Sequence, residues 1–353
     1  MDFDKSKLVN KDFKELFNHY SENSLLGLRD SKIFISGGTG FVGTWISELV
    51  SFLNDEFKFG IKLSLLSRNV EKFKQISPHL FKRKDIELIS GDVRHIFEVP
   101  SDTNFIIHAA AIPDSRFHAN SPLETMSIIA DGTKNILNLS TRLGDLRTFL
   151  NISSAYVYGY MPPELSKFPE NYNGSIPSYA MSSAYAEAKR YAETMCASAT
   201  SQLRIPIINA RPFSFIGAYQ SINSPWAINN FIRDAINGYP IRILGDGETI
   251  RSYMYGADMA FWFFTILCRG VVGQSYNVGS PNAISLNQLA KKISSYFNNK
   301  SEIQLSVGGS GGEKVHKSKL VPDTSFAENS LGLRHVFNLD LALEQSVLWY
   351  SKA

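Results

Sequence analysis

A glycine-rich turn between an apolar strand and an amphipathic helix sets the strongest limit on how this chain can fold. The turn reads Ser36-Gly37-Gly38-Thr39-Gly40-Phe41-Val42-Gly43. Residues 32–35 before it are typical of a buried strand, and residues 45–53 after it have the apolar spacing of a helix. Glycines in such a unit let the backbone approach a pyrophosphate, which binds at the free N–H groups of the helix N-terminus. The segment therefore predicts a dinucleotide site.

A second segment, Tyr185-Ala186-Glu187-Ala188-Lys189, carries candidate catalytic groups. On a helix, Tyr185 and Lys189 share one face, so we expect the ammonium to lie near the phenol. A free tyrosine titrates near pH ~10, and a neighbouring positive charge lowers this pKa. Tyr185 is thus a candidate general acid or base for a carbonyl or hydroxyl that exchanges hydride with a nicotinamide. The same spacing also occurs on ordinary amphipathic helices, so other motifs must decide whether this pair is catalytic.

The order of the motifs along the chain decides in favour of function. The motifs are Gly37 to Gly43, Gly91-Asp92-Val93-Arg94, His108-Ala109-Ala110-Ala111, residues 153–159, Tyr185 with Lys189, Arg211-Pro212, Gly245-Asp246-Gly247 with Arg251-Ser252-Tyr253, and Tyr276-Asn277-Val278-Gly279. Over about residues 31–340 the chain resembles the extended short-chain dehydrogenase/reductase family. That family includes nucleotide-sugar epimerases, dehydratases, decarboxylases and ketoreductases.

The resemblance implies an α/β fold, a Rossmann-like doubly wound parallel sheet with a smaller C-terminal substrate-binding lobe. We expect residues 31–210 to form the dinucleotide-binding domain. Residues 211–353 should form mostly the nucleotide-sugar-binding lobe, with segments that return to the sheet. Residues 1–30 precede this fold; their apolar residues at helical spacing predict a helical extension. A helix docked on its own domain is favoured over a partner-binding arm, and an oligomer contact stays open.

Composition excludes several other classes of protein. A formal net charge of +3, with dispersed basic residues, argues against nucleic acid as a partner. No apolar run is long enough to span a membrane, the first residues do not resemble a signal peptide, and Cys196 and Cys268 lie in apolar stretches. We therefore expect a cytoplasmic protein with no membrane partner. No histidine and cysteine spacing predicts a metal site. By resemblance, the chain should form a homodimer.

The end of the second predicted strand bears on the choice of cofactor. NAD-binding folds place a carboxylate there, which accepts from the ribose 2′-hydroxyl and would repel a 2′-phosphate. This chain has Ser67-Arg68-Asn69 and no acidic residue between Gly60 and Glu71. Because Arg68 can pair with a phosphate, NADP(H) is favoured over NAD(H). The alternative is that Arg68 is a solvated loop residue and that the protein accepts NAD.

The resemblance extends the cofactor site beyond the turn. It assigns the adenine amino group to Asp92, and close approach of the chain beneath the cofactor to the three alanines after His108. His108 itself is interpreted as structural, and Ile129 stands where relatives usually carry an asparagine. The complete predicted cofactor set is Gly37, Gly38, Thr39, Gly40, Phe41, Val42, Gly43, Ser67, Arg68, Asp92, Val93, Ala109, Ala110, Ala111, Tyr185 and Lys189.

The resemblance also supplies a third catalytic candidate, Ser154, which would hydrogen-bond the reacting sugar oxygen beside Tyr185. Nucleotide-sugar 4,6-dehydratases carry Asp-Glu directly after this serine, and decarboxylases tend to keep the glutamate. Here Ala155-Tyr156 stands in their place, which argues against both reactions. The predicted substrate contacts are Ser154, Ser214, Asn229 as a candidate diphosphate ligand, and Arg251 as the arginine that pairs with the substrate diphosphate.

Ser154, Tyr185 and Lys189 suffice to move one hydride and one proton at a sugar C4. The sequence therefore predicts a nucleotide-sugar oxidoreductase, and the preference for NADP(H) favours reduction of a nucleotide-linked 4-keto-6-deoxyhexose. A 4-epimerase is the leading alternative, ahead of a 4,6-dehydratase or decarboxylase. A non-catalytic binding module is disfavoured because it predicts loss of the catalytic set, which is complete here.

Overall fold

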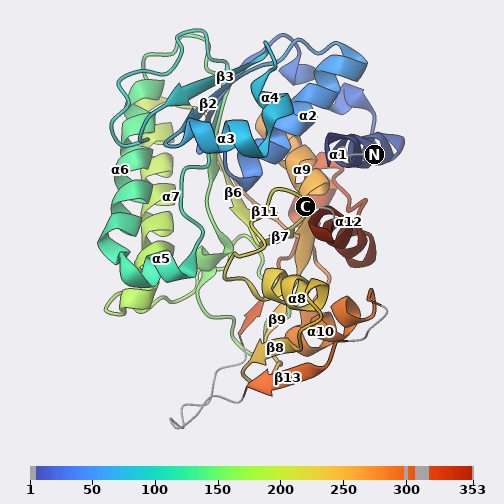
Figure 1. Cartoon of the computed structure of the whole chain (residues 1–353). Coiled ribbons are helices and arrows are strands. Elements are labelled where there is room, and N and C mark those ends of the chain that lie inside the picture. The colour runs from blue at the N-terminus through green and yellow to red at the C-terminus, as the bar shows by residue number, and fades with distance from the viewer. Residues whose placement is uncertain (1–4, 298–300, 307–317, 352–353) are drawn as a thin grey trace.

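The computed structural model describes residues 5–297, 301–306 and 318–351 and is built around one parallel sheet. Its seven strands run in the order β11-β6-β5-β4-β1-β2-β3, and every neighbouring pair is parallel (Figure 1). This order is that of a doubly wound nucleotide-binding sheet, which confirms the predicted fold class. The strands are β1 (Lys32–Ser36), β2 (Lys62–Ser67), β3 (Ile86–Ser90), β4 (Phe105–His108), β5 (Thr148–Ile152), β6 (Ile207–Pro212) and β11 (Ser275–Val278).

Helices cover both faces of the sheet. On one face lie α2 (Phe41–Phe57) and α9 (Gly256–Arg269), and on the other lie α6 (Pro122–Ser140) and α7 (Ala184–Leu203) (Figure 1). The side chains of β1 alternate between these layers, as a strand buried on both sides requires. Ile33 and Ile35 belong to the core beneath α2 and α9, whereas Phe34 belongs to the core beneath α6 and α7.

The N-terminal extension forms α1 (Lys5–His19) and the 3₁₀-helix η1 (Glu22–Leu28), both docked on the main body. Phe13 is fully buried and packs edge-on against Trp45 of α2, with ring centroids 5.9 Å apart. Asp12 is buried beside it and accepts a 2.6 Å hydrogen bond from the Tyr255 hydroxyl. The apolar face predicted for this helix therefore packs against its own chain.

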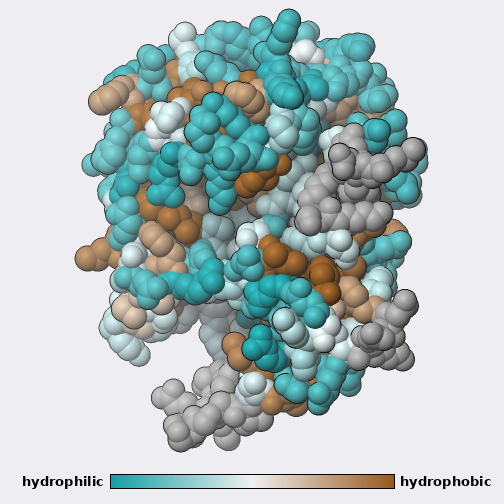
Figure 2. Space-filling model, viewed as in Figure 1, coloured by the Kyte–Doolittle hydropathy of each residue, from teal (hydrophilic) through white to brown (hydrophobic). Residues whose placement is uncertain are grey.

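Helices α3 (Val70–Ile76) and α4 (Pro78–Phe81) follow β2 and pack on the sheet domain, and most of the other elements form a smaller lobe beside the carboxyl ends of the strands and the segments that join it to the sheet (Figure 1). The molecular surface is hollowed between this lobe and the sheet domain (Figure 2). The lobe and its connections comprise β7 (Ser214–Ile216), α8 (Ala227–Ile236), β8 (Ile241–Leu244), β9 (Ile250–Arg251), β10 (Tyr253–Tyr255), β12 (Ile284–Ser285), α10 (Leu286–Ser294), β13 (Ile303–Ser306), β14 (Lys319–Leu320), α11 (Ser325–Leu331) and α12 (Leu339–Ser351).

Several local expectations need correction. The first helix begins at Phe41, directly after the glycine turn, rather than near residue 45. The short helix α5 (Ser115–Asn120) was not predicted. A serine before a helix is a typical N-cap, but Ser183 before α7 makes no side-chain cap; its hydroxyl donates to the Pro177 carbonyl instead. Residues 161–179 form no helix or named strand, yet Phe168 within them is fully buried, because it stacks on the Tyr158 ring at 4.9 Å.

A buried polar network joins three of the sequence motifs at the ends of β6 and β11. Arg211 makes a bidentate ion pair with Glu193 of α7 at 2.7 and 2.9 Å, and its Nη1 donates to the Tyr158 hydroxyl oxygen at 3.0 Å. Tyr158 in turn donates to Asn277 Oδ1 at 2.6 Å. Asn277 Nδ2 donates to the Phe168 carbonyl, which ties the 161–179 segment down. Buried charges persist only when paired in this way, so these motif residues have a structural task.

Candidate active site

The glycine turn has the geometry that close approach to a phosphate requires. Gly37 adopts φ +70°, and a Cβ there would lie 2.9 Å from the Ala109 carbonyl oxygen. A Cβ on Gly43 would lie 2.2 Å from the Gly38 oxygen, so α2 can pack this closely against the turn only without a side chain. Gly40 begins α2 without a side-chain cap. The first N–H groups of α2 are therefore free of side-chain acceptors and can bind an anion.

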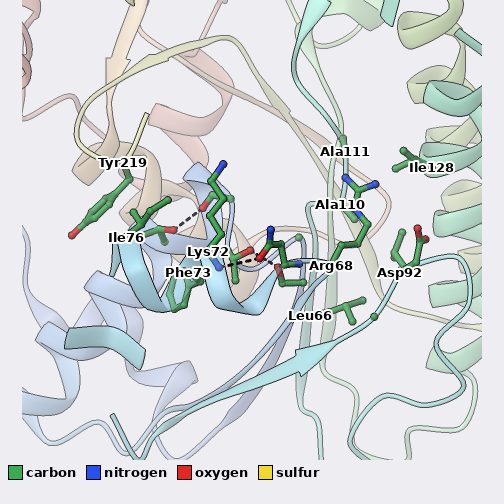
Figure 3. A pocket seen from close by; sticks show the side chains of 18 residues that line it. Leu66, Arg68, Lys72, Phe73, Ile76, Asp92, Ala110, Ala111, Ile128 and Tyr219 are labelled. Atoms are coloured by element: carbon green, nitrogen blue, oxygen red, sulfur yellow. Dashed lines mark hydrogen bonds between the residues drawn. The ribbon is translucent and has the colours of Figure 1, made fainter. Parts of the chain in front are cut away.

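A pocket of about 290 Å³ opens at this turn (Figure 3). It brings together nine of the predicted cofactor residues: Gly37, Thr39, Gly40, Ser67, Arg68, Asp92, Val93, Ala110 and Ala111. Tyr185 and Lys189, which were also predicted to bind the cofactor, do not line it. Neither do Gly38, Phe41, Val42, Gly43 and Ala109. They shape the turn or pack behind it, as when Phe41 stacks on Phe215 with centroids 6.1 Å apart. The pocket therefore matches the adenosine and phosphate end of a dinucleotide.

Several pocket residues were missed by the sequence analysis. They are Thr44, Leu66, Asn69, Lys72, Phe73, Ile76, Gly91, Ile128 and Tyr219. Lys72 could have been found from the sequence. The helix that follows β2 begins after Asn69, and Lys72 lies in its first turn, on the side of the helix that Asn69 caps. Tyr219 gave no local signal, since it arrives from the segment after β7 with φ +69°. Its hydroxyl donates to Glu48 Oε1, which also accepts from His79 at 2.6 Å.

The end of β2 offers hydroxyl and cationic groups in place of a carboxylate. Ser67 is buried, and its Oγ lies 2.6 Å from Thr39 Oγ1 and accepts from the Asn69 N–H at 3.2 Å. Arg68 and Lys72 both line the pocket; the Arg68 guanidinium lies beside Ala110, and the Lys72 ammonium lies on the side of Ile76 and Tyr219 (Figure 3). A phosphate-bearing ribose would meet two positive charges here, so these donors fit a dinucleotide.

Asp92 lies at the rim of the same pocket and is held by Arg94. The Arg94 guanidinium donates to both carboxylate oxygens at 2.8 and 2.9 Å, and it also reaches Glu124 and Ser127 of α6. Hydrogen bonds from Arg94 lower the pKa of Asp92 to about 2, so the carboxylate is ionised at neutral pH. An ionised carboxylate can accept a hydrogen bond, and the role of Asp92 toward an adenine amino group stays a prediction.

Ser154 and Tyr185 lie together, as predicted. Ser154 is buried at the start of η2 (Ala155–Tyr158), and its Oγ accepts from the Tyr156 N–H at 3.2 Å. Burial raises the pKa of the half-buried Tyr185 to about 12, while a side-chain hydrogen bond with Ser154 acts in the opposite direction. Tyr185 is therefore a neutral phenol at physiological pH, ready to donate a proton. The expected lowering of its pKa is wrong for the chain without cofactor.

The position of Lys189 explains why the pKa of Tyr185 is not lowered. Its side chain is only 5% exposed, and its Nζ donates to the Ile152 carbonyl at 2.7 Å. Burial lowers the pKa of Lys189 to about 8, because desolvation disfavours the ammonium. Lys189 thus lies on the catalytic face of α7 but is turned toward the backbone at the end of β5. Neighbouring His108 is structural as interpreted, since its ring nitrogens bond Ser36 at 2.7 Å and Thr133 at 3.0 Å.

The predicted substrate residues are distributed over the smaller lobe. Ser214 begins β7 and is half-buried. Asn229 of α8 is 1% exposed, and its Nδ2 donates at 3.3 Å to both the Ser221 carbonyl and the Tyr350 hydroxyl. Its Oδ1 has no partner among the described residues. Arg251 donates to the Ser318 carbonyl at 3.0 Å and the Ser318 hydroxyl at 3.1 Å. The roles assigned to these residues in binding a substrate stay predictions.

Comparison with known proteins places this geometry in a family. The sequence profile of the NAD dependent epimerase/dehydratase family matches residues 33–279, which include the glycine turn, Ser154, Tyr185 and Lys189. The chain belongs to this family. Its recognition as an extended short-chain dehydrogenase/reductase is therefore confirmed, and the sheet order agrees with the fold of this family.

Individual members of the epimerase/dehydratase family are similar over almost the whole chain. UDP-glucuronic acid decarboxylase 1 of Danio rerio is 27% identical over 340 residues, which covers 94% of this chain and 76% of that protein. An epimerase of Methanothermobacter thermautotrophicus has a TM-score of 0.77 at 20% identity, covering 94% and 95% of the two chains. A UDP-glucuronic acid 4-epimerase from Bacillus cereus, solved with UDP-glucuronic acid and NAD, has a TM-score of 0.74 at 20% identity, covering 90% and 98%. At these identities the two structures support the fold alone.

Two general features of this family member bear on its chemistry. Among residues 5–297, 301–306 and 318–351, no three histidine, cysteine, aspartate or glutamate side chains are grouped so that they could hold a metal ion. No helix in this part of the chain is long and apolar enough to cross a membrane.

Proposed function

We propose that this chain is an NADP(H)-dependent nucleotide-sugar oxidoreductase that reduces C4 of a nucleotide-linked 4-keto-6-deoxyhexose. One observation carries the proposal. Ser154 and a neutral Tyr185 lie together at the end of β5, and no carboxylate follows Ser154. A proton donor without a second acid or base supports the transfer of one proton, as a ketone reduction requires.

The residues after Ser154 support a reduction over an elimination. Ala155 is buried and carries no polar group, and Tyr156 is 55% exposed with its ring edge-on to Tyr185 at 5.9 Å. Removal of water across C5 and C6 needs an acid and a base, and neither side chain can act as a carboxylate at neutral pH. These two residues therefore disfavour a 4,6-dehydratase.

Residues that include Gly37, Ser67 and Arg68 would hold NADPH, which when bound would provide the hydride for C4 of the sugar. Tyr185 holds a proton at its phenol oxygen and donates it to the oxygen on C4, where negative charge develops. Ser154 orients this oxygen through its hydroxyl. Lys189 lies one helical turn after Tyr185, and on moving from the Ile152 carbonyl toward the cofactor it would supply positive charge near the phenol and a donor to the ribose. Positive charge near the phenol favours its ionised form once the proton has been given up.

The end of β2 supports NADP(H) as the cofactor. A 2′-phosphate there would meet the Ser67 hydroxyl, Arg68 and Lys72, with no carboxylate to repel it. The Bacillus cereus epimerase was solved with NAD. The cofactor that we propose for this chain therefore differs from the NAD of that protein. The affinities for NADPH and NADH test this difference.

A nucleotide-diphosphate sugar is the proposed substrate class. The Danio rerio decarboxylase and the Bacillus cereus epimerase act on UDP-linked sugars by their names, and the smaller lobe offers Ser214, Asn229 and Arg251 for such a substrate. We also propose a homodimer. Leu123 and Met126 on α6, with Tyr191 on α7, are exposed apolar groups that a second copy could cover. Light scattering on the eluted protein would measure the mass of the particle.

The test is to incubate the purified protein with NADPH and a nucleotide-linked 4-keto-6-deoxyhexose and to follow absorbance and the sugar product. We expect one NADPH oxidised per sugar reduced, and a fall in kcat of about 100-fold or more in Tyr185→Phe. Tyr191→Phe, on the exposed side of the same helix, should keep the parent rate.

Parallel incubations with UDP-glucose and UDP-glucuronic acid distinguish the alternatives. Conversion of UDP-glucose into its 4-epimer, with no net cofactor oxidation, would replace the reductase with an epimerase. Release of CO₂ from UDP-glucuronic acid would replace it with a decarboxylase. If no sugar nucleotide is changed while the cofactor still binds, the catalytic proposal fails and a binding module remains.

A further inference from the structure

The catalytic ring of Tyr185 is contacted on its face by a histidine that no motif points to. His118 lies on α5, and its imidazole stacks on the phenol ring with centroids 4.3 Å apart and planes inclined by 14°. Both residues are half-buried, so the stacked pair borders the reaction site rather than the core. Aromatic rings stacked at this distance attract each other.

His118 is itself fixed to the backbone beside the cofactor pocket. Its Nε2 lies 2.6 Å from the Ile112 carbonyl oxygen, which can only accept, so Nε2 carries the proton. Ile112 directly follows Ala111, which lines the pocket. The helix is fixed at its start as well, since the Asp114 side chain accepts from the Arg116 N–H at 2.9 Å. The imidazole therefore has a defined orientation when Tyr185 packs on it.

The other contacts of Tyr185 leave the face of the ring to His118. Tyr156 meets the phenol edge-on, with the two planes at 89°. Ile129, Ala188 and Ala192 form the small apolar cluster behind it. Lys189 is turned to the Ile152 carbonyl. Within the described part of the chain, His118 is the residue that stacks on this ring.

We propose that His118 is a positioning residue, which sets the orientation of the Tyr185 ring and thereby the place of its phenol oxygen. This inference rests on the proposed role of Tyr185 as the proton donor. It adds a contact from α5, a helix that the sequence did not predict. A general acid has to lie within hydrogen-bond reach of the oxygen that it protonates, and a displacement of about 1 Å can cost about 100-fold in rate.

Three substitutions separate the two contacts of the imidazole. His118→Phe keeps an aromatic ring for stacking but cannot donate to Ile112. His118→Gln keeps a donor that can reach Ile112 but has no ring. His118→Ala removes both. Arg116→Gln, on the same short helix with an exposed side chain, is the matched control.

The first readout needs no substrate. In protein with ¹³C-labelled tyrosine, the ring signal of Tyr185 is assigned by its absence from Tyr185→Phe. A stacked ring shifts this signal upfield, so we expect His118→Phe and Arg116→Gln to keep the shift and His118→Gln and His118→Ala to lose it. A parent-like signal in His118→Ala would overturn the inference, whether or not the reaction assignment is correct.

The second readout is the reaction itself, with NADPH affinity and Tm as checks on folding. We expect kcat to fall about 10-fold to 100-fold in His118→Gln and His118→Ala. His118→Phe should restore most of it, with KM, NADPH affinity and Tm close to those of the parent. Equal loss in His118→Phe and His118→Ala, or full activity in His118→Gln, would contradict positioning by stacking. If the parent has no activity on any sugar nucleotide, the proposed function fails, and the labelled-tyrosine spectra still test the stacking.

Discussion

Ser67, at the end of β2, is the residue whose replacement discriminates best between the two cofactors. Its buried hydroxyl bonds Thr39 and receives the Asn69 N–H in a pocket that Arg68 and Lys72 make positive. Ser67→Asp places a carboxylate where the ribose of an NAD-binding fold finds one and where a 2′-phosphate would be repelled. We expect NADPH affinity to fall by about 10-fold or more and NADH affinity to hold or rise.

Titration calorimetry or fluorescence with each cofactor measures the effect of Ser67→Asp. Lys62→Gln, at the exposed far end of the same strand, is the control and should change neither affinity. An unchanged NADPH affinity in Ser67→Asp would mean that the 2′-phosphate does not lie at the end of β2.

Individual residues also show how far sequence reasoning reaches. Tyr185, Lys189 and Ser154 could be named from motif order, and the structure places all three around the end of β5. The effect of Lys189 on the phenol could not be predicted from its position on α7. It depends on where the Lys189 Nζ finds an acceptor, and that acceptor is a carbonyl of a distant strand.

At the scale of an element, the turn and α2 form one unit whose packing depends on two glycines. A Cβ on Gly43 would lie 2.2 Å from the Gly38 oxygen, so Gly43→Ala must push the helix away from the turn. We expect a loss of about 1–3 kcal/mol in the free energy of unfolding, together with weaker cofactor binding.

Chemical denaturation with and without NADPH measures the change in Gly43→Ala. Gly144→Ala is the matched control, since nothing lies within 4 Å of a Cβ there, and its free energy of unfolding should stay within about 0.5 kcal/mol of the parent. Parent-like stability and affinity in Gly43→Ala would show that the turn tolerates displacement of α2.

The local sequence pattern predicted the helices and strands only in part. The strand and helix types of the sheet domain were predictable, because buried parallel strands are short apolar runs and their helices have a period of 3.6 residues. Helix α5 was missed because it is six residues long and without an apolar stripe. Yet it carries His118, so the element with the weakest signal supplies a contact to the catalytic ring.

At the scale of the whole molecule, the N-terminal helix makes stability depend on pH. Asp12 of α1 is buried against Tyr255, and desolvation raises its pKa from 3.8 to about 7. A carboxyl whose pKa is higher in the folded than in the unfolded state favours folding fully below pH 3.8, and this contribution is lost as the pH rises to about 7. Asp258 of α9, with its pKa also raised to about 7, acts in the same direction.

We therefore expect Asp12→Asn to flatten the decline in stability between about pH 4 and pH 7, because the amide keeps an acceptor for Tyr255 but cannot ionise. One linked proton corresponds to a slope of at most about 1.4 kcal/mol per pH unit. Denaturation curves at several pH values give this slope. Asp145→Asn, on the surface, should leave it unchanged. The same decline in Asp12→Asn as in the parent would rule out Asp12 as its source.

The long-range assembly of the molecule was the part that sequence could not supply. The motifs around Tyr158, Arg211 and Asn277 were recognised separately, but only the fold joins them in one buried network. The predicted substrate residues of the smaller lobe likewise have partners that no local pattern encodes, such as Ser318 for Arg251.

Hydride transfer to C4 of the sugar is the central claim, and isotope transfer tests it most directly. The parent enzyme is incubated with a nucleotide-linked 4-keto-6-deoxyhexose and NADPH that carries deuterium at C4 of its nicotinamide, and the product is analysed by NMR and mass spectrometry. The account predicts one deuterium at sugar C4, absent when Tyr185→Phe replaces the parent. Product without deuterium at C4, or conversion of a sugar nucleotide with no loss of NADPH, would contradict it.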